Sequence, residues 1–234
     1  MQGRLVLDEN NDPDDLTGYN VCSLYLDGPG FCLYNQTLQG QKNRFKLRIR
    51  FYDNDPDGPA FLEIKRRETE VIKKKRAAVT RKGALQVLAG GFPKSSMLFK
   101  KKGNMDALDG FCRLLRTIDA RGAVYVVYKR EAYVSPGSDH VRVTFDRDLY
   151  GGYYRQGDDL LVPEKRPGSA PDWEGCVLEM KFTDRFPEWM NEVAQLFNLQ
   201  RISVPKYVMC VDALGVYKAN ERPNEFRAVR DRKF

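Results

Sequence analysis

Long apolar runs, paired cysteines and histidines are nearly absent from this 234-residue chain. No stretch approaches the ~20 apolar residues that cross a bilayer, and the N-terminus lacks the apolar core of a signal peptide. We therefore expect a cytoplasmic protein without a transmembrane segment. The five cysteines form no CxxC pair and are odd in number, which argues against a disulfide framework or a zinc site. His140 is the one histidine and lies in a polar stretch, so Ser–His and Cys–His catalysis is disfavoured.

Positive charge is what the chain has in excess. The formal net charge is +7 and the pI is about 9.1, which favours an anionic partner such as nucleic acid, a membrane surface or a phosphate compound. No aromatic stacking platform interleaves with the basic residues, so we expect no nucleic-acid partner.

Basic residues alternate with apolar residues over 44–51, where Arg44, Lys46, Arg48 and Arg50 are separated by Phe45, Leu47, Ile49 and Phe51. A period of two is that of a β-strand with one cationic and one apolar face. A second strand candidate, 61–67, sets Glu63, Lys65 and Arg67 against Leu62 and Ile64, and a third short run follows at 74–76. Like charges directly opposite each other across a ladder repel, and a polyanion between them would remove that repulsion.

The remaining elements divide the chain into an acidic lead-in (1–20), a main domain (21–218) and a basic tail (219–234). Helical spacing of apolar residues predicts one helix over 104–118, capped by Asn104, and a second that begins near Pro187. Residues 31–35 are expected to be extended, and residues 81–103 are expected to form a mobile basic loop. Further strands are expected at 21–27, 123–134, 141–146, 177–182 and 206–211.

Several of these strands have one apolar and one charged face, and the two amphipathic helices each need an apolar surface to cover. If the helices cover the outside of the sheet, the charged faces meet inside. The fold is then α+β, with an antiparallel β-barrel whose tunnel has a polar, basic interior. An open sheet with one wet, charged face fits the pattern equally well.

Arginine and lysine donors in such a tunnel suit phosphate oxygens. Glu63 and Glu179, if they face the same cavity, could hold a divalent ion that bridges phosphates. For either glutamate alone, a salt bridge to a neighbouring arginine is the simpler interpretation. Phosphoryl transfer relies mainly on positioning and charge neutralisation, so it does not require a nucleophile–base pair.

In these stretches the chain resembles the VTC (vacuolar transporter chaperone) domain, a branch of the triphosphate tunnel metalloenzymes with the CYTH-like fold. The resemblance spans residues 21–210 and rests on the runs Ser23–Asp27, Lys46–Tyr52, Phe61–Lys65, Tyr128–Tyr133, Val141–Asp146 and Leu178–Phe182. It implies a β-tunnel that synthesises polyphosphate by transferring the γ-phosphate of ATP to a growing chain, with Mn²⁺ or Mg²⁺ as cofactor. The implied partners are ATP and polyphosphate.

Position by position, the resemblance implies that Glu179 binds the metal, with Glu63 a second ligand because it faces the same way as Lys65. Arg48, Arg50, Lys65 and Arg142 are the candidate catalytic residues. The candidate phosphate-binding residues are Arg48, Arg50, Lys65, Lys74, Arg76, Arg130, Arg142 and Lys206.

Two departures from the family pattern bear on activity. Pro205 replaces a serine before the late lysine, and the family's opening strand with a Glu-x-Lys pattern is not found. Besides an ATP–polyphosphate phosphotransferase, two alternatives therefore stay open. One is a hydrolase of inorganic or organic triphosphates, and the other is a non-catalytic polyphosphate- or nucleotide-binding module.

Overall fold

The computed structural model describes residues 3–9, 11, 18–69, 71–100, 103–137, 140–183 and 185–219. Over these residues the chain builds one antiparallel sheet of eight strands. Seven of them run in the order β5-β4-β3-β2-β6-β7-β8, and the eighth, β1, pairs with β6. The strands are β1 (Val6–Leu7), β2 (Tyr19–Asp27), β3 (Arg44–Phe51), β4 (Pro59–Glu68), β5 (Val71–Thr80), β6 (Arg121–Val134), β7 (Val141–Tyr153) and β8 (Val177–Phe182). The alternating patterns at 44–51, 61–67 and 141–146 are thus confirmed as strands.

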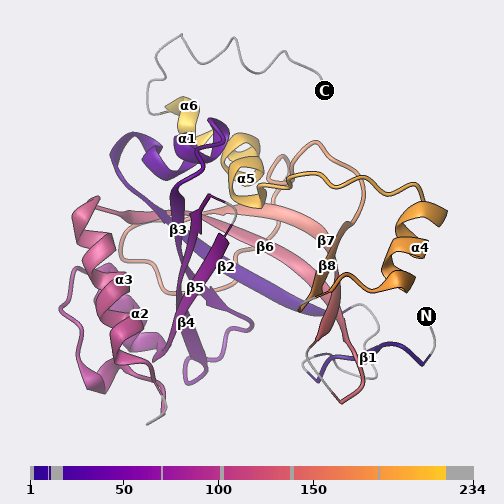
Figure 1. The fold of residues 1–234 in the computed structure, drawn as a ribbon. Coiled ribbons are helices and arrows are strands. Elements are labelled where there is room, and N and C mark those ends of the chain that lie inside the picture. The colour runs from indigo at the N-terminus through magenta and orange to yellow at the C-terminus, as the bar shows by residue number, and fades with distance from the viewer. Residues whose placement is uncertain are drawn as a thin grey trace.

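The sheet is curled into a half-barrel, with β5 and β8 at its two ends (Figure 1). These ends do not pair with each other in the described part of the chain. The charges of Glu179 and Lys181 on β8 nevertheless act on Lys65 of β4. The charged faces of distant strands therefore face one another across the concave side, which is the first of the two arrangements that the alternation left open.

The convex side carries the larger apolar core. Leu47, Ile49 and Phe51 of β3 are fully buried there beneath α2 (Arg81–Leu88) and α3 (Met105–Thr117). The helix expected over 104–118 is confirmed, and Asn104 caps it by accepting a hydrogen bond from the Ala107 amide at 2.9 Å. The expected basic loop at 81–103 is wrong in its first part, because residues 81–88 form α2, capped by the Thr80 hydroxyl.

The helix expected near Pro187 is confirmed as α4 (Glu188–Leu196), which lies beside β8 (Figure 1). It buries Met190 against Val141 and Val143 on the convex side of β7. The end of its predicted apolar face is not covered: Leu196 is 78% and Phe197 64% exposed.

Two expected extended segments are helices instead. Residues 206–211 belong to α5 (Lys206–Leu214). Residues 32–38 form α1 (Cys32–Leu38), preceded by a 3₁₀ turn at Pro29–Phe31. In α1 the Asp27 carboxylate accepts from the amides of Leu33 (2.8 Å) and Tyr34 (2.9 Å), so the helix begins on a residue from the end of β2.

Helix α5 lies on the concave side, unlike α2, α3 and α4. Tyr207, Val208 and Val211 pack against concave residues of β2 and β6, such as Tyr25 and Val126. Helix α5 therefore fills part of the half-barrel, and the basic residues of the concave face lie beside the helix. The short α6 (Val216–Ala219) follows it.

The acidic lead-in supplies β1, and the predicted basic tail lies outside the described residues from position 220 onward. No helix within the described residues is long and apolar enough to cross a bilayer.

Candidate functional site

The concave face of β3, β4 and β5 presents basic residues in rows across the strands. One row places Lys46, Lys65 and Lys74 directly opposite one another. The next places Arg48, Glu63 and Arg76 side by side, with Tyr25 of β2 beyond Arg48. The structure thus brings together Arg48, Lys65, Lys74 and Arg76 of the predicted phosphate-binding set, and adds Lys46.

Glu63 is the centre of the second row and is only 1% exposed. Its Oε2 accepts from Arg48 Nε at 2.7 Å and lies 2.6 Å from Arg48 Nη2. Its Oε1 lies 2.6 Å from Lys74 Nζ and 3.4 Å from Arg76 Nε. Burial by itself would raise the pKa of Glu63, but Arg48, Arg50 and Lys74 lower it to about 2. The Glu63 carboxylate is therefore ionised, and it holds the three cationic side chains in fixed orientations.

In the lysine row, Lys74 pairs with Glu63 of the neighbouring row, whereas the ion pairs of the described residues include none for Lys46 or Lys65. Burial lowers the pKa of Lys46, Lys65 and Lys74, and the charge of Arg48 lowers all three further. An anion placed over this row would relieve both effects, because it compensates the lost hydration and separates the like charges.

Arg50 is the most deeply buried of the predicted phosphate ligands, at 7% exposure. Its guanidinium donates to Ser23 Oγ at 3.1 Å and to Tyr128 OH at 3.3 Å. Within the described residues it forms no ion pair with a carboxylate. The hydrogen-bond partners of this buried cation are neutral hydroxyls, and the Glu63 carboxylate acts on it only through space. An incoming anion in direct contact with Arg50 would therefore be favourable.

A second charged cluster joins β6, β7 and α5. Arg130 donates to both oxygens of Asp146, at 2.7 and 2.8 Å, and Lys206 Nζ lies 2.8 Å from Asp146 Oδ2. Burial would raise the pKa of Asp146, but Arg130 and Lys206 lower it. Asp146 is 2% exposed and thus fixes two predicted phosphate ligands, one on the sheet and one on α5.

The predicted metal ligands do not lie together in a carboxylate cluster. The described residues contain no group of three or more His, Cys, Asp or Glu side chains arranged to hold a metal ion. Glu63 is committed to its three cations and does not fit a metal. Glu179 fits better: its side chain is 38% exposed, and its contacts are Lys181 Nζ at 3.1 Å and Arg130 Nη2 at 3.8 Å. Mg²⁺ is commonly held by one or two carboxylates plus substrate phosphates, and Glu179 matches that arrangement.

Tyr207 fixes α5 in the concave side. Its ring stacks on Tyr25 with centroids 4.8 Å apart, and its hydroxyl donates to Asp27 Oδ2 at 2.7 Å. Because Tyr25 OH accepts from Arg48 Nη1 at 3.1 Å, the stack connects α5 to the Glu63 row.

We expect Tyr207→Phe to lower the free energy of unfolding by about 1–3 kcal/mol, because it removes one donor from a buried carboxylate. Urea denaturation followed by circular dichroism measures the change. Tyr153→Phe is the matched control, since the Tyr153 hydroxyl bonds Leu214 O at 2.8 Å but the residue is 51% exposed. Equal losses of unfolding free energy in the two variants would contradict the role of the Tyr207 hydroxyl in holding α5.

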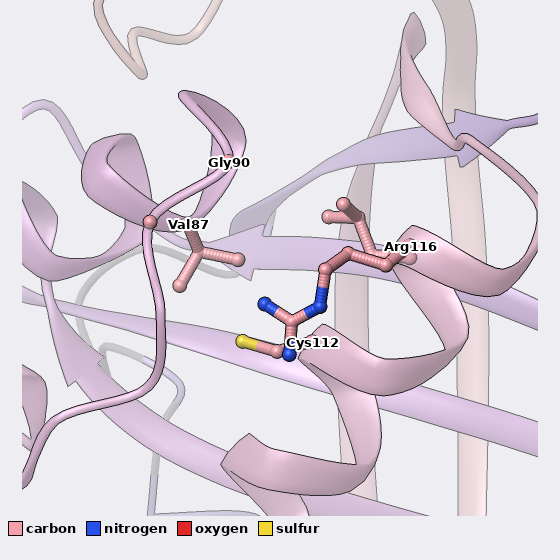
Figure 2. A pocket seen from close by; sticks show the side chains of 6 residues that line it. Val87, Gly90, Cys112 and Arg116 are labelled. Atoms are coloured by element: carbon pink, nitrogen blue, oxygen red, sulfur yellow. The ribbon is translucent and has the colours of Figure 1, made fainter.

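The sequence interpretation missed Lys46, Asp146 and Tyr25. Lys46 was recoverable, since it alternates in phase with Arg48. Asp146 shares a strand face with Arg142, but its role depends on Arg130 and on Lys206, 60 residues away. On the convex side, the crevice between the end of α2 and α3 is too tight for a water molecule, and the Arg116 guanidinium points toward buried Cys112 in it (Figure 2). A wide-open hollow on α3 is lined by Asp109, Arg113, Arg116 and Thr117 and contains none of the predicted site residues.

Comparison with known proteins identifies a family and a relative that the chain resembles. The VTC domain family matches residues 2–215. The chain is 25% identical over 179 residues to vacuolar transporter chaperone complex subunit 2 of Schizosaccharomyces pombe; the match covers 71% of this chain and 23% of that protein. The chain thus spans about a quarter of the length of that relative.

Among solved structures, a candidate adenylate cyclase from Bacillus halodurans superposes with a TM-score of 0.43 at 13% identity, over 80% of this chain and 78% of that one. An adenylyl cyclase candidate from Hippeastrum, described as having a dominant triphosphatase activity, superposes with a TM-score of 0.40 at 14% identity, over 88% and 84%. These likenesses are too weak to carry an argument. The family match covers most of the chain, and the chain therefore belongs to the VTC domain family.

Proposed function

We propose that the concave face binds a polyphosphate chain and ATP, and transfers the γ-phosphate of ATP to the chain end. The observation that supports this most directly is Arg50, a buried guanidinium without a carboxylate partner in the described part of the chain. The opposed lysines of β3, β4 and β5 support it further. Arg50 and these lysines together form a surface whose positive charges a linear polyanion would compensate.

Six of the predicted residues have a part in the proposed mechanism: Arg48, Arg50, Lys65, Arg130, Glu179 and Lys206. Arg48 and Arg130 are held in fixed orientations by Glu63 and Asp146, so each presents its remaining N–H donors to phosphate oxygens without reorganising. Arg50 and Lys65 neutralise charge that develops on the transferred phosphoryl group. Lys206 of α5 adds a further donor near Arg130, because both side chains pair with Asp146.

Glu179 would hold Mn²⁺ or Mg²⁺ together with the phosphates, and the ion would neutralise phosphate oxygens. To bind the ion, Glu179 would give up its contacts with Lys181 and Arg130. Burial would raise the pKa of Glu179, but Lys181 and Arg130 lower it. The carboxylate is thus already ionised and available as a ligand at neutral pH.

Binding without turnover is the second candidate function. It is favoured by the commitment of Glu63 to three cations, which leaves Glu179 as the single carboxylate of the predicted pair with metal-binding capacity. The binding function uses the same basic rows and needs no metal.

The test incubates the purified chain with ATP and Mn²⁺ and resolves the products on a gel, with released phosphate measured in parallel. We expect a ladder of polyphosphate from the wild type, no ladder from Glu179→Gln, and a normal ladder from Glu188→Gln on the exposed side of α4. Released phosphate without a ladder would indicate a triphosphate hydrolase. Polyphosphate binding without either product would indicate the binding module, and an active Glu179→Gln protein would contradict the metal assignment.

A further inference from the structure

Arg142, a predicted catalytic residue, is held by a carboxylate from the beginning of the chain. Asp8 follows β1 directly, is 5% exposed, and its Oδ2 lies 2.7 Å from Arg142 Nη1. The Asp8 amide donates to Ala132 O at 2.9 Å, and the Asn11 side chain bonds both Asp8 O and Ala132 O. A buried carboxylate therefore takes the place at Arg142 that a phosphate oxygen would take.

The same part of the concave face contains a hydroxyl without a partner. Thr144 lies between Ala132 and Glu179 in the register of β6, β7 and β8, two residues from Arg142 on the same strand face. It is 1% exposed, and its Oγ1 has no hydrogen-bond partner within the described residues. A buried hydroxyl without a partner is unfavourable, and an arriving phosphate oxygen would accept its hydrogen bond.

Asp8 differs from the carboxylates that position the other arginines. Glu63 and Asp146 lie inside long strands. Asp8 lies beside a strand of two residues that is paired through Val6 and Leu7. The strand pairing that holds Asp8 is therefore shorter than the pairings that hold Glu63 and Asp146.

We propose that Arg142 and Thr144 form a phosphate subsite that the Asp8 carboxylate occupies in the ligand-free protein. A phosphate group of the polyanion displaces Asp8, takes the Arg142 guanidinium and accepts from the Thr144 hydroxyl. Asp8 is then a specificity-determining residue, because a ligand must carry enough negative charge elsewhere on the basic rows to outcompete it. Single phosphates are excluded and long chains are admitted. The inference rests on the proposed function, since it assigns a further contact to the same polyanion.

Isothermal titration of the full chain with tripolyphosphate, and separately with inorganic phosphate, tests the subsite. We expect Asp8→Asn to bind tripolyphosphate about tenfold more tightly, the effect of roughly one charged contact. Thr144→Val is expected to bind about fivefold more weakly and Thr144→Ser about as well as the wild type, because serine keeps the hydroxyl. Inorganic phosphate should bind measurably only when Asp8 is replaced.

Asp119→Asn, which alters an exposed ion pair with Arg121, is the control for a general change in charge. If Asp8→Asn does not fold, Asn11→Ala loosens the same segment and should also tighten binding. Unchanged or weaker binding in the Asp8 and Asn11 variants would overturn the proposed competition, and wild-type affinity in Thr144→Val would overturn the hydroxyl contact. A wild-type protein that does not bind tripolyphosphate at all would instead overturn the proposed function on which the subsite rests.

Discussion

Replacing Glu63 with alanine is expected to lower the free energy of unfolding by about 3–5 kcal/mol, the usual cost of leaving buried partners without their opposite charge. The residue is 1% exposed and its two oxygens lie between Arg48, Lys74 and Arg76. Without it, these cations repel one another across three strands. For a chain of this size the loss corresponds to a melting temperature lower by about 6–20 °C.

Differential scanning calorimetry measures that shift. Glu68→Ala is the matched control, because Glu68 pairs with Lys73 and Arg66 on the same pair of strands but in solvent, where such pairs contribute little. We expect no measurable change from it. A Glu63→Ala protein that melts within 2 °C of the wild type would show, by the usual shift per kcal/mol, that the buried carboxylate is not needed to hold the cations together.

The same carboxylate predicts a dependence on pH. Because the pKa of Glu63 is about 2 in the folded protein and 4.5 in its unperturbed state, its contribution is fully present above about pH 4.5. It is lost as the pH falls toward 2, and amounts to about 3 kcal/mol. Denaturant titrations at pH 7 and pH 3 should therefore show a smaller acid-induced loss of stability for Glu63→Gln than for the wild type.

Replacing Arg50 with methionine is expected to weaken ligand binding and to leave the stability of the fold nearly unchanged. Affinity for tripolyphosphate should fall by about 10- to 100-fold, the equivalent of one charge-assisted contact. The free energy of unfolding should stay within about 1 kcal/mol of the wild type, because a buried charge without a carboxylate partner is replaced by an apolar side chain of similar length. Isothermal titration and urea denaturation of the same preparation measure both quantities.

Arg81 provides the matched control for Arg50. It is a similarly buried arginine, 6% exposed, but on the convex side, where it pairs with Asp53 at 3.0 Å and stacks on Phe51. Arg81→Met should destabilise the fold and leave the affinity of the folded protein unchanged. If Arg50→Met also lost stability and kept its affinity, Arg50 would be a structural residue and the central support for anion binding would be removed.

The positions of most strands and of two helices were predictable from local pattern, but β1 and the helical state of 206–211 were not. In 44–51 and 141–146 the apolar residues alternate strictly, in 61–67 Leu62 and Ile64 alternate with charged residues, and one face of a strand must be buried. The apolar spacing within 104–118 and the cap at Asn104 similarly define α3. These features depend on neighbours in sequence, so the sequence contains the information.

Helix α5 was not predicted because a short apolar run is ambiguous between strand and helix. Tyr207, Val208 and Val211 favour a strand by composition, yet the spacing of Tyr207, Val211 and Leu214 is helical. The structure resolves the ambiguity through contacts far away in the chain. Asp27 and Tyr25 of β2 receive Tyr207, and Asp146 of β7 receives Lys206.

The sequence by itself determined that one face of the sheet is strongly basic, because alternation places each cation on a known side. Only the tertiary structure decided which of those cations are neutralised. Arg48, Arg130 and Arg142 have carboxylate partners on adjacent strands or in the lead-in, whereas the ion pairs of the described residues leave Arg50 without one. The physical reason is that a carboxylate compensates a buried charge only over a few ångströms, and strand register and the course of β1 and α5 set those distances.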